Sequence, residues 1–576
     1  MRREHSSACV GAAAALTAVL VLAGCGASDS QAPNQEPALV SLAPGQSALV
    51  AGTTTLRIQG GSTGSENVLV LSDTATVSVS AKSNYTVTAT GVGAAGAVSA
   101  PATSLDPLAT AATSVNPVAY ATSSAPAIDM SFGMRLNQAS QPRLQRGFSA
   151  ARSMLATRTA TPNGRLRSLS SSVPSVGDLM NLNVSQNACD SLVTRDARVV
   201  AVSTRAIVLE DITNPTGGFT TADYQRFAAR FDTLVYPLDV ANFGAPADID
   251  QNQRILLLFT KAVNELTPRN SSSYVGGFFF NRDLFPTTDT PQFQGCKGSN
   301  VGEMFYLLAP DPNGAVNGNI RRTGFVDSVT TSVLAHEFQH LINGSRRLYV
   351  NTSAEDFEAT WLNEGLSHVA EELLFYREAN LGPRQNIDVT LLRSTQTIRV
   401  AFNSDMSSNA SRYMLYLAAP SENSPIRNDD SLETRGATWN FLRYAADRKG
   451  QAEATTWQAL VNSTTTGVAN LRTVFGADIA GMLRDWAVSH YADDLNSSVA
   501  REQTQPSWNF HNIFPALGSG NNPYPLQVRS LQGSAASGTL IGGGAAYYRF
   551  SIPANTTAEI NVAAPGPVQA VVVRVR

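Results

Sequence analysis

The sequence predicts a multidomain protein in which an α+β core is flanked by small all-β modules at both ends. The chain has 576 residues, enough for about three to four domains at roughly 150 residues each. Short runs of alternating apolar residues, separated by glycine and serine, occur near both ends. Between them lie long stretches with the apolar spacing of helices and a few buried-strand patterns.

Composition excludes several classes of protein. Apolar residues make up 43% and charged residues 15%, so this is not a charge-driven disordered chain. The 42 basic and 45 acidic residues give a net charge of −3, which supplies no electrostatic footprint for nucleic acid and no polybasic membrane patch. We therefore expect no nucleic-acid partner.

Residues 1–24 have the layout of a secretory signal peptide, with two arginines before an apolar stretch that is too short to span a bilayer comfortably. The stretch ends in Leu22-Ala23-Gly24-Cys25, which resembles the bacterial lipobox. The resemblance implies cleavage after Gly24, lipidation of Cys25 and residues 25–37 as a tether. It places the chain at the bacterial cell envelope, lipid-anchored at the outer membrane, in the periplasm or at the cell surface. The alternative is a plain signal peptide with a chance cysteine.

Loss of Cys9 with the signal peptide and acylation of Cys25 leave Cys189 and Cys296. In an oxidising compartment, two remaining thiols are most simply interpreted as one disulfide. Two unrelated buried thiols are the alternative.

The modules follow in order along the chain. Residues 38–91 contain strand-like segments divided by glycine and serine turns and predict an N-terminal β module. Residues 92–175 are an Ala/Ser/Thr/Pro linker followed by an arginine-bearing, propeptide-like arm with helical spacing in places. Residues 176–515 combine a buried strand at 254–259 with long helices. Residues 516–576 return to strands and predict a C-terminal β module.

A helix is predicted over residues 331–344, with Asp327 as N-cap and Gly344 as the stop. His336 and His340 lie one turn apart on one face of it, and Glu337 stands beside them. Two imidazoles at this spacing can bind one zinc ion while the carboxylate faces the water in the open position. A helix with merely polar or buried histidines is the alternative.

A second predicted helix carries Glu364, 24 residues after His340. A catalytic zinc needs three protein ligands and one open position, and this carboxylate completes a His₂Glu set. The stretch Trp361-Leu362-Asn363-Glu364-Gly365-Leu366 resembles the third-ligand helix of gluzincin metallopeptidases, as found in aminopeptidases and in hyicolysin-type secreted endopeptidases.

Residues 176–509 resemble the hyicolysin-like family throughout, with less specific support from segments 217–224, 302–307 and 435–442. The resemblance implies a zinc endopeptidase with a thermolysin-like core that acts on protein or peptide substrates. It also implies His336, His340 and Glu364 as zinc ligands and Glu337 as general base.

The sequence departs from the thermolysin pattern four residues after Glu364, where an orienting aspartate is replaced by His368. His368 is a candidate fourth ligand, transition-state donor or neighbour of the ligands, or else a surface histidine. Glu371 lies two turns along the same face as Glu364 and matches an acidic position of the aminopeptidases. We expect it to orient a ligand histidine.

A tetrahedral oxyanion needs a donor besides zinc. Aminopeptidases place a tyrosine three residues before a glycine on the next helix, but here that position is Glu433. The remaining candidates are Tyr413, Tyr416, Arg435 and Tyr444, each with a purely structural alternative.

Asp248, Asp250 and Asn252 place oxygen ligands at positions one, three and five of a loop, a pattern typical of calcium sites. The twelfth position is Phe259, so the loop is not an EF-hand. The alternative is a polar turn leading into the next strand.

These observations predict a zinc-dependent endopeptidase of extracellular or periplasmic proteins. One alternative is an aminopeptidase-type exopeptidase, although Gly302-Glu303-Met304 is only a faint echo of the motif that anchors a substrate α-amine. The other is an envelope binding or adhesion protein with a vestigial zinc site.

Overall fold

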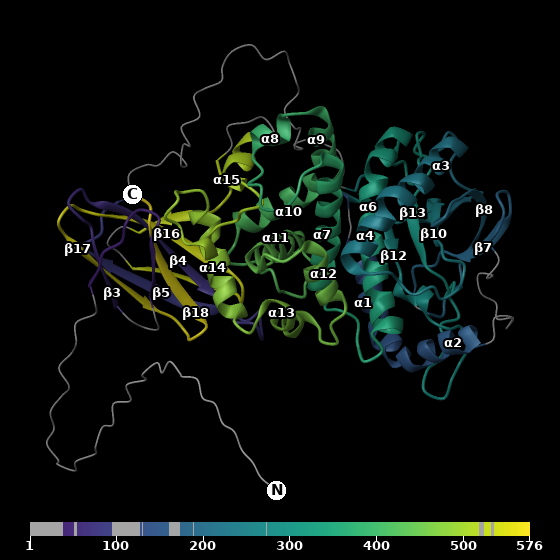
Figure 1. Cartoon of the computed structure of the whole chain (residues 1–576), viewed down its shortest axis with the longest axis horizontal. Coiled ribbons are helices and arrows are strands. Elements are labelled where there is room, and N and C mark those ends of the chain that lie inside the picture. Colours follow the sequence, from purple (N-terminus) through teal and green to yellow (C-terminus); the bar gives the residue numbers. More distant parts are fainter. Residues whose placement is uncertain are drawn as a thin grey trace, which may run out of the picture.

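Figure 1 shows the computed structural model of the chain, which describes residues 39–50, 55–94, 127–128, 131–160, 173–187, 189–271, 273–517, 523–531 and 535–576. The expected signal peptide, lipidation site and tether lie outside these residues, as does much of the expected linker. None of the helices within the described ranges is both long and apolar enough to cross a membrane.

Strands from both ends of the chain form two five-stranded sheets (Figure 1). The strands are β1 (Leu39–Val40), β2 (Ser47–Val50), β3 (Thr55–Gln59), β4 (Ser65–Asp73), β5 (Ser83–Thr90), β14 (Val528–Ser530), β15 (Ala536–Leu540), β16 (Ala545–Ile552), β17 (Thr557–Ala563) and β18 (Val568–Arg574). One sheet has the order β1-β3-β17-β5-β15 and the other β14-β16-β4-β18-β2. Their apolar faces share one core, so they form a single β-sandwich.

The expectation of two separate β modules, at residues 38–91 and 516–576, is therefore corrected. Strand β4 pairs antiparallel with β16 on one side and β18 on the other, and β17 lies between β3 and β5. Without the strands from the other end of the chain, β4 and β17 would each lose the neighbours on both of their sides. A stable sheet needs such neighbours and a second layer to pack against.

Strand β4 is buried on both faces. Leu69 and Leu71 belong to the sandwich core, whereas Val68 and Val70 join the core of the rest of the molecule. Side chains alternate across a strand, so the continuous apolar run in β4 is the sequence of a strand covered on both sides. The outer cover is helix α14 (Ile479–Ala492), which lies against β4 and β18.

A six-stranded sheet forms the opposite end of the molecule (Figure 1). Its strands are β7 (Leu179–Asn183), β8 (Thr194–Val202), β9 (Ala206–Asp211), β10 (Ile255–Thr260), β12 (Gly277–Phe279) and β13 (Met304–Leu308). Their order is β12-β13-β10-β9-β8-β7, with β10 parallel to both β9 and β13. All six residues of β10 are buried, in agreement with its uninterrupted apolar sequence.

Helices fill the space between this sheet and the sandwich and cover the sheet. They are α3 (Thr221–Arg230), α4 (Tyr236–Phe243), α5 (Lys261–Asn264), α6 (Thr323–Ser345), α7 (Thr360–Ala379), α8 (Val389–Arg393), α9 (Gln396–Ala401), α10 (Ser407–Ala418), α11 (Leu432–Lys449), α12 (Glu453–Val461), α13 (Gly467–Phe475) and α15 (Phe510–Ile513). Short π-helical turns span Phe231–Val235, Arg346–Val350 and Phe402–Met406, and 3₁₀ turns span Asn281–Leu284, Arg501–Gln503 and Phe514–Ala516. Helix α6 contacts β12 and β13 as well as α7, so it joins the sheet to the helical region.

Helix α6 is longer than the sequence predicted. It begins at Thr323, and Asp327 is not its cap but pairs with Arg226 at 2.7 Å. Gly344 does not end the helix. A Cβ atom at this position would collide with the side chain of Asn281, so the glycine permits close approach of the segment that follows β12.

Part of the stretch expected as linker and arm is packed structure. Helices α1 (Ser131–Arg146) and α2 (Phe148–Ala160) bury Leu144, Phe148 and Ala151 in the main core. Strand β6 (Ala127–Ile128) pairs with β11 (Ser273–Tyr274). In α1, the Asn137 side chain donates to Phe279 O at 3.0 Å and accepts from the backbone N–H of Asn281 at 2.8 Å. The arm thus covers the exposed edge of the sheet at β12.

The structure joins Cys189 and Cys296 in a disulfide, with Cα atoms 4.2 Å apart. The bridge links the loop after β7 to the loop before β13 and closes a loop of 107 residues. Closing a loop of this length restricts the unfolded chain, which favours the folded state.

We predict that a chain ending at Leu517 loses the sandwich, because β3, β4 and β5 would lose their partners β16, β17 and β18. Leu69, Leu71 and Val87, which are buried in the sandwich, would become exposed. Limited proteolysis followed by mass spectrometry should show rapid cleavage within residues 39–94 of the truncated chain and resistance in the full chain. Equal resistance of the two chains would contradict the shared sandwich.

We also predict that the protein becomes less stable in acid because of His490 on α14. Burial lowers the pKa of its side chain from 6.5 to about 3, and His511 adds to this effect. Its Nδ1 lies 2.9 Å from the Tyr547 hydroxyl of β16. Below pH 6.5 the unfolded chain binds a proton that the folded chain does not, so the free energy of unfolding falls by up to about 1.4 kcal/mol per pH unit until about pH 3. Denaturant unfolding across this range should give a smaller slope for His490→Gln than for wild type, and equal slopes would contradict the assignment.

Candidate metal centre

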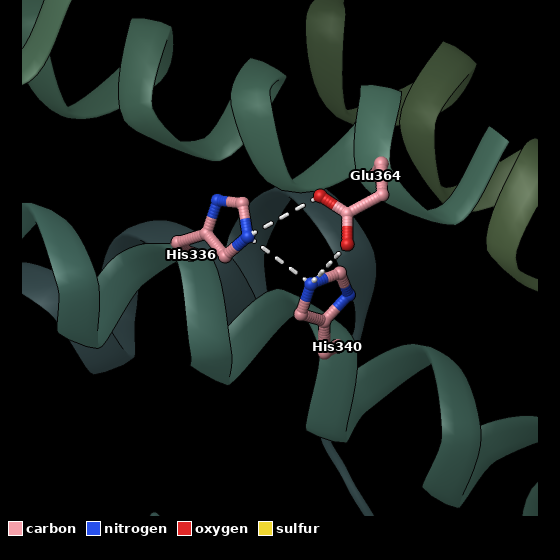
Figure 2. A group of neighbouring side chains, drawn as sticks. All are labelled: His336, His340 and Glu364. Carbon is pink, nitrogen blue, oxygen red and sulfur yellow. Dashed lines mark hydrogen bonds and ion pairs between the residues drawn. The ribbon is translucent and has the colours of Figure 1, made fainter. Parts of the chain in front are cut away.

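Helices α6 and α7 bring His336, His340 and Glu364 to one point (Figure 2). The two histidine Nε2 atoms are 3.1 Å apart. Glu364 Oε1 lies 3.4 Å from Nε2 of His340, and its Oε2 lies 3.6 Å from Nε2 of His336. All three side chains are buried, so the three donor atoms converge in a site shielded from bulk water.

The spacing of the donor groups suits zinc. Ligand atoms about 2.05 Å from a tetrahedral zinc are about 3.3 Å from one another. The two histidine Nε2 atoms are 3.1 Å apart, and each lies 3.4 to 3.6 Å from a different oxygen of Glu364. Two imidazoles and a carboxylate are also the ligand set of one class of catalytic zinc sites, in which the fourth position is left to water. The residues present therefore match both the size and the chemistry of the ion.

Groups behind the ligands orient both imidazole rings. Glu371 Oε1 lies 2.8 Å from Nδ1 of His336, and Ser367 Oγ lies 2.9 Å from Nδ1 of His340. With the proton on Nδ1, each ring presents the lone pair of Nε2 to the site. The hydroxyl of Ser367 in turn donates to the side-chain oxygen of Gln339 at 2.7 Å.

His368 is fully buried beside the ligands, so it is not a surface histidine. Its Nδ1 lies 3.1 Å from Glu371 Oε2, and its ring centroid lies 4.9 Å from that of His336. The Nε2 atom lies 3.9 Å from Glu364 Oε2 and has no hydrogen-bond partner among the described residues. Glu371 therefore holds two imidazoles, one with each carboxylate oxygen.

Arg435 of α11 forms an ion pair with Glu364 and a second one with Asp430, at 2.6 Å. Burial opposes ionisation of Glu364, but Arg435 and His340 outweigh it and lower the pKa of Glu364 to about 2. Burial raises the pKa of Asp430 to about 7 despite Arg435. Glu364 is thus held as a carboxylate, which is the form that binds a metal.

The electrostatic surroundings keep His336 available as a neutral ligand. Burial, with a further contribution from His340, lowers the pKa of His336 well below its ordinary value. For His340, burial is outweighed by Glu364 and the pKa rises. A bound cation favours the unprotonated ring, because the metal and the proton compete for one lone pair.

Glu337 lies next to the first ligand on α6 and is almost completely buried. Its Oε2 accepts a hydrogen bond from the backbone N–H of Phe279 in β12, at 2.8 Å. Burial raises the pKa of Glu337 to about 7, near the value at which a carboxylate can both take up and release a proton at neutral pH.

The structure does not bring Tyr413 and Tyr416 to the metal ligands, which corrects their status as candidate donors. Both rings lie in an aromatic cluster with Trp486 and His490 of α14. The Tyr413 hydroxyl accepts from the side chain of Gln505 at 3.3 Å. The two rings stack on each other and hold α10 against the helices nearest the sandwich.

Three residues around the candidate ligands were not predicted from the sequence: Ser367, Asp430 and Arg412. Ser367 stands three residues after Glu364, on the same face of the helix, and this spacing could have identified it. Asp430 precedes α11. Arg412 lies on α10, and its charge adds to the effect of burial in lowering the pKa of His336 and His368. No local pattern in the sequence marks these two.

Comparison with known proteins shows a distant similarity to a metalloprotease. The chain is 28% identical over 210 residues to the neutral metalloprotease ShpI of Staphylococcus hyicus. The match covers 35% of this chain and 44% of that protein, so the chain spans less than half of this relative's length. No family model matches the chain. Together with the His-His-Glu cluster, this distant similarity supports a place among the metallopeptidases.

We predict that Glu371→Gln weakens zinc binding by about 10- to 100-fold, because the ring of His336 loses its charged partner. Competition with a chromophoric chelator measures the affinity. The matched control is Glu378→Gln, at an acidic residue of the same helix whose partner is Arg230, at 2.6 Å. Unchanged affinity in Glu371→Gln, with intact helical content, would contradict the orienting role.

Proposed function

We propose that this chain is a zinc-dependent endopeptidase that hydrolyses peptide bonds of extracellular or periplasmic proteins. The observation that carries the proposal is the buried triangle of His336, His340 and Glu364, with donor separations of 3.1 to 3.6 Å. The distant similarity to a neutral metalloprotease agrees with it. We further propose the gluzincin type, with a hyicolysin-like domain and a thermolysin-like arrangement of its two zinc helices.

The chemistry requires a nucleophile and a base. Zinc, when bound, lowers the pKa of a coordinated water and polarises the substrate carbonyl. Glu337 is the general base in this proposal. Because Phe279 N–H occupies Oε2, Oε1 is the atom left to accept the proton of the attacking water and then pass it to the leaving amine.

The residues around the ligands have positioning roles in this proposal. Glu371 orients His336 and His368, and Arg435 holds Glu364 ionised and in place. His368 Nε2 and Arg435 are the candidates for contact with the oxyanion in this proposal. Tyr413 and Tyr416 pack against His490, and the hydroxyl of Tyr444 donates to Glu502 O.

The position of Glu303 argues against the aminopeptidase alternative. This glutamate, in the faint echo of an α-amine-binding motif, is 1% exposed, and its Oε1 accepts from Ile249 N–H at 2.7 Å. It belongs to a cluster with Asp248 and Asp250 and not to the His-His-Glu group. Recognition of a free N-terminus by this residue is therefore not supported.

We also propose that the protein is exported and anchored to the cell envelope through lipidated Cys25. The paired cysteines at 189 and 296 are compatible with an oxidising compartment. In this arrangement the residues between the anchor and the sandwich act as a tether that keeps the catalytic domain away from the membrane.

We predict that Glu337→Gln retains about one zinc per chain but hydrolyses casein at least about 100-fold more slowly than wild type, because it lacks the general base. A peptide with a blocked N-terminus separates the candidate activities, since an endopeptidase cleaves it and an aminopeptidase does not. The control is Glu422→Gln, which changes an exposed carboxylate in the loop between α10 and α11.

Equal digestion by wild type and Glu337→Gln would remove the enzyme hypothesis. A wild-type chain that binds zinc but digests neither substrate would favour the binding or adhesion alternative.

A further inference from the structure

A second group of carboxylates lies outside the His-His-Glu site. It is formed by the loop before β10 and by Glu303, the residue that precedes β13. Asp248, Asp250 and Glu303 each place an oxygen within 4.8 Å of the others. Two oxygens bound at about 2.4 Å to the same calcium ion lie at most about 4.8 Å apart. The separations are therefore those of a set of ligands that can share one calcium ion.

Glu303 supplies an independent indication that a cation belongs here. The residue is 1% exposed. Its Oε1 accepts from the backbone N–H of Ile249 at 2.7 Å, but its buried Oε2 has no hydrogen-bond partner among the described residues. An unsatisfied carboxylate oxygen in the interior is strongly unfavourable. A cation shared with two aspartates would satisfy it.

Basic side chains close to the loop, among them Arg254 and Arg205, contact other partners. Arg254 donates from Nε to Ser203 O at 2.7 Å and from Nη1 to Asn252 O at 2.8 Å. The guanidinium of Arg205 lies over the ring of Tyr236, 4.8 Å from its centroid. Neither contact neutralises Glu303.

The ligand set differs from the one the sequence suggested. Asn252 donates from Nδ2 to Asp250 Oδ2 at 2.6 Å, and its Oδ1 accepts from Arg254 N–H at 2.7 Å. Its side-chain oxygen thus accepts from the backbone of the loop, as do Asp248 and Asp250, to which Asn252 N–H donates at 3.1 and 3.2 Å. The carboxylate of Glu303, whose Oε2 has no hydrogen-bond partner among the described residues, is the third ligand in this set in place of the neutral Asn252 amide. It lies beside the aspartates because β10 and β13 are neighbours, with Leu256 N–H donating to Glu303 O at 2.9 Å.

We propose that Asp248, Asp250 and Glu303 bind one calcium ion that ties the loop before β10 to the start of β13. All three ligands are hard carboxylate oxygens, with no nitrogen or sulfur donor, which suits calcium and not zinc. The exposed side of the site at Asp248 leaves room for water ligands to complete the coordination. The ion would stabilise the six-stranded sheet. That sheet includes β12, whose Phe279 N–H donates to Glu337.

The test uses the full chain with its zinc content measured before and after removal of calcium by a chelating resin. Isothermal titration with calcium chloride should show one saturable site in wild type, and calcium should raise the melting temperature. Asp248→Asn and Glu303→Gln should bind calcium at least about tenfold more weakly, because each loses a charged ligand. The matched control Glu422→Gln should bind as wild type does, and zinc content should be equal in all four proteins.

If Glu303→Gln folds poorly, Asp248→Asn still tests the proposal, because Asp248 is exposed and its replacement should disturb folding less. Absence of saturable calcium binding in wild type would overturn the proposal. Wild-type affinity in a folded Asp248→Asn, or magnesium binding as tight as calcium binding, would also overturn it. Because zinc content and casein hydrolysis are read separately, failure of this site is distinguishable from failure of the zinc centre.

Discussion

The candidate metal centre depends on the close packing of α7 between α6 and α11. Glu364 and Arg435 are each followed by a glycine, and both glycines lie where helices touch. A Cβ atom on Gly365 would collide with Thr438 of α11, and one on Gly436 would collide with the backbone of α10 at Arg412. These contacts let the helix backbones approach closely. The approach of α7 to α11 places Arg435 against Glu364.

The helices around the candidate metal centre also require that their buried charges be paired. Glu364 and Glu371 are buried together with Arg435 and Arg412, and the side chain of Asp430 is 6% exposed. An uncompensated charge in such surroundings is strongly destabilising. The ion pairs of Arg435 with Glu364 and Asp430 compensate two of the acids, and a divalent cation held by His336, His340 and Glu364 would add further positive charge. The same constraint explains why Glu371 contacts both His336 and His368.

The six-stranded sheet and helix α1 also contact the residues around the candidate site. Strand β12 is an edge strand whose Phe279 N–H holds Glu337, while the carbonyl of the same residue accepts from Asn137 of α1. The arm therefore contacts the strand that positions the proposed base. At the other end, the sandwich is fastened to α14 through the hydroxyl of Tyr547, which donates to Ala487 O at 2.8 Å.

The sequence by itself determined the local features: the histidine pair on one helical face, Glu337 beside it, Glu364 on a second helix and the buried strand at β10. Each depends on spacing within one element, where helical or strand geometry relates neighbours directly. Only the tertiary structure decided which distant segments meet. It placed strands from both ends in one sandwich, put the two tyrosines in an aromatic cluster with residues of α14, and brought Glu303 beside Asp248 and Asp250. Such contacts arise from packing and strand pairing between residues far apart in the chain, and no periodicity in the sequence records them.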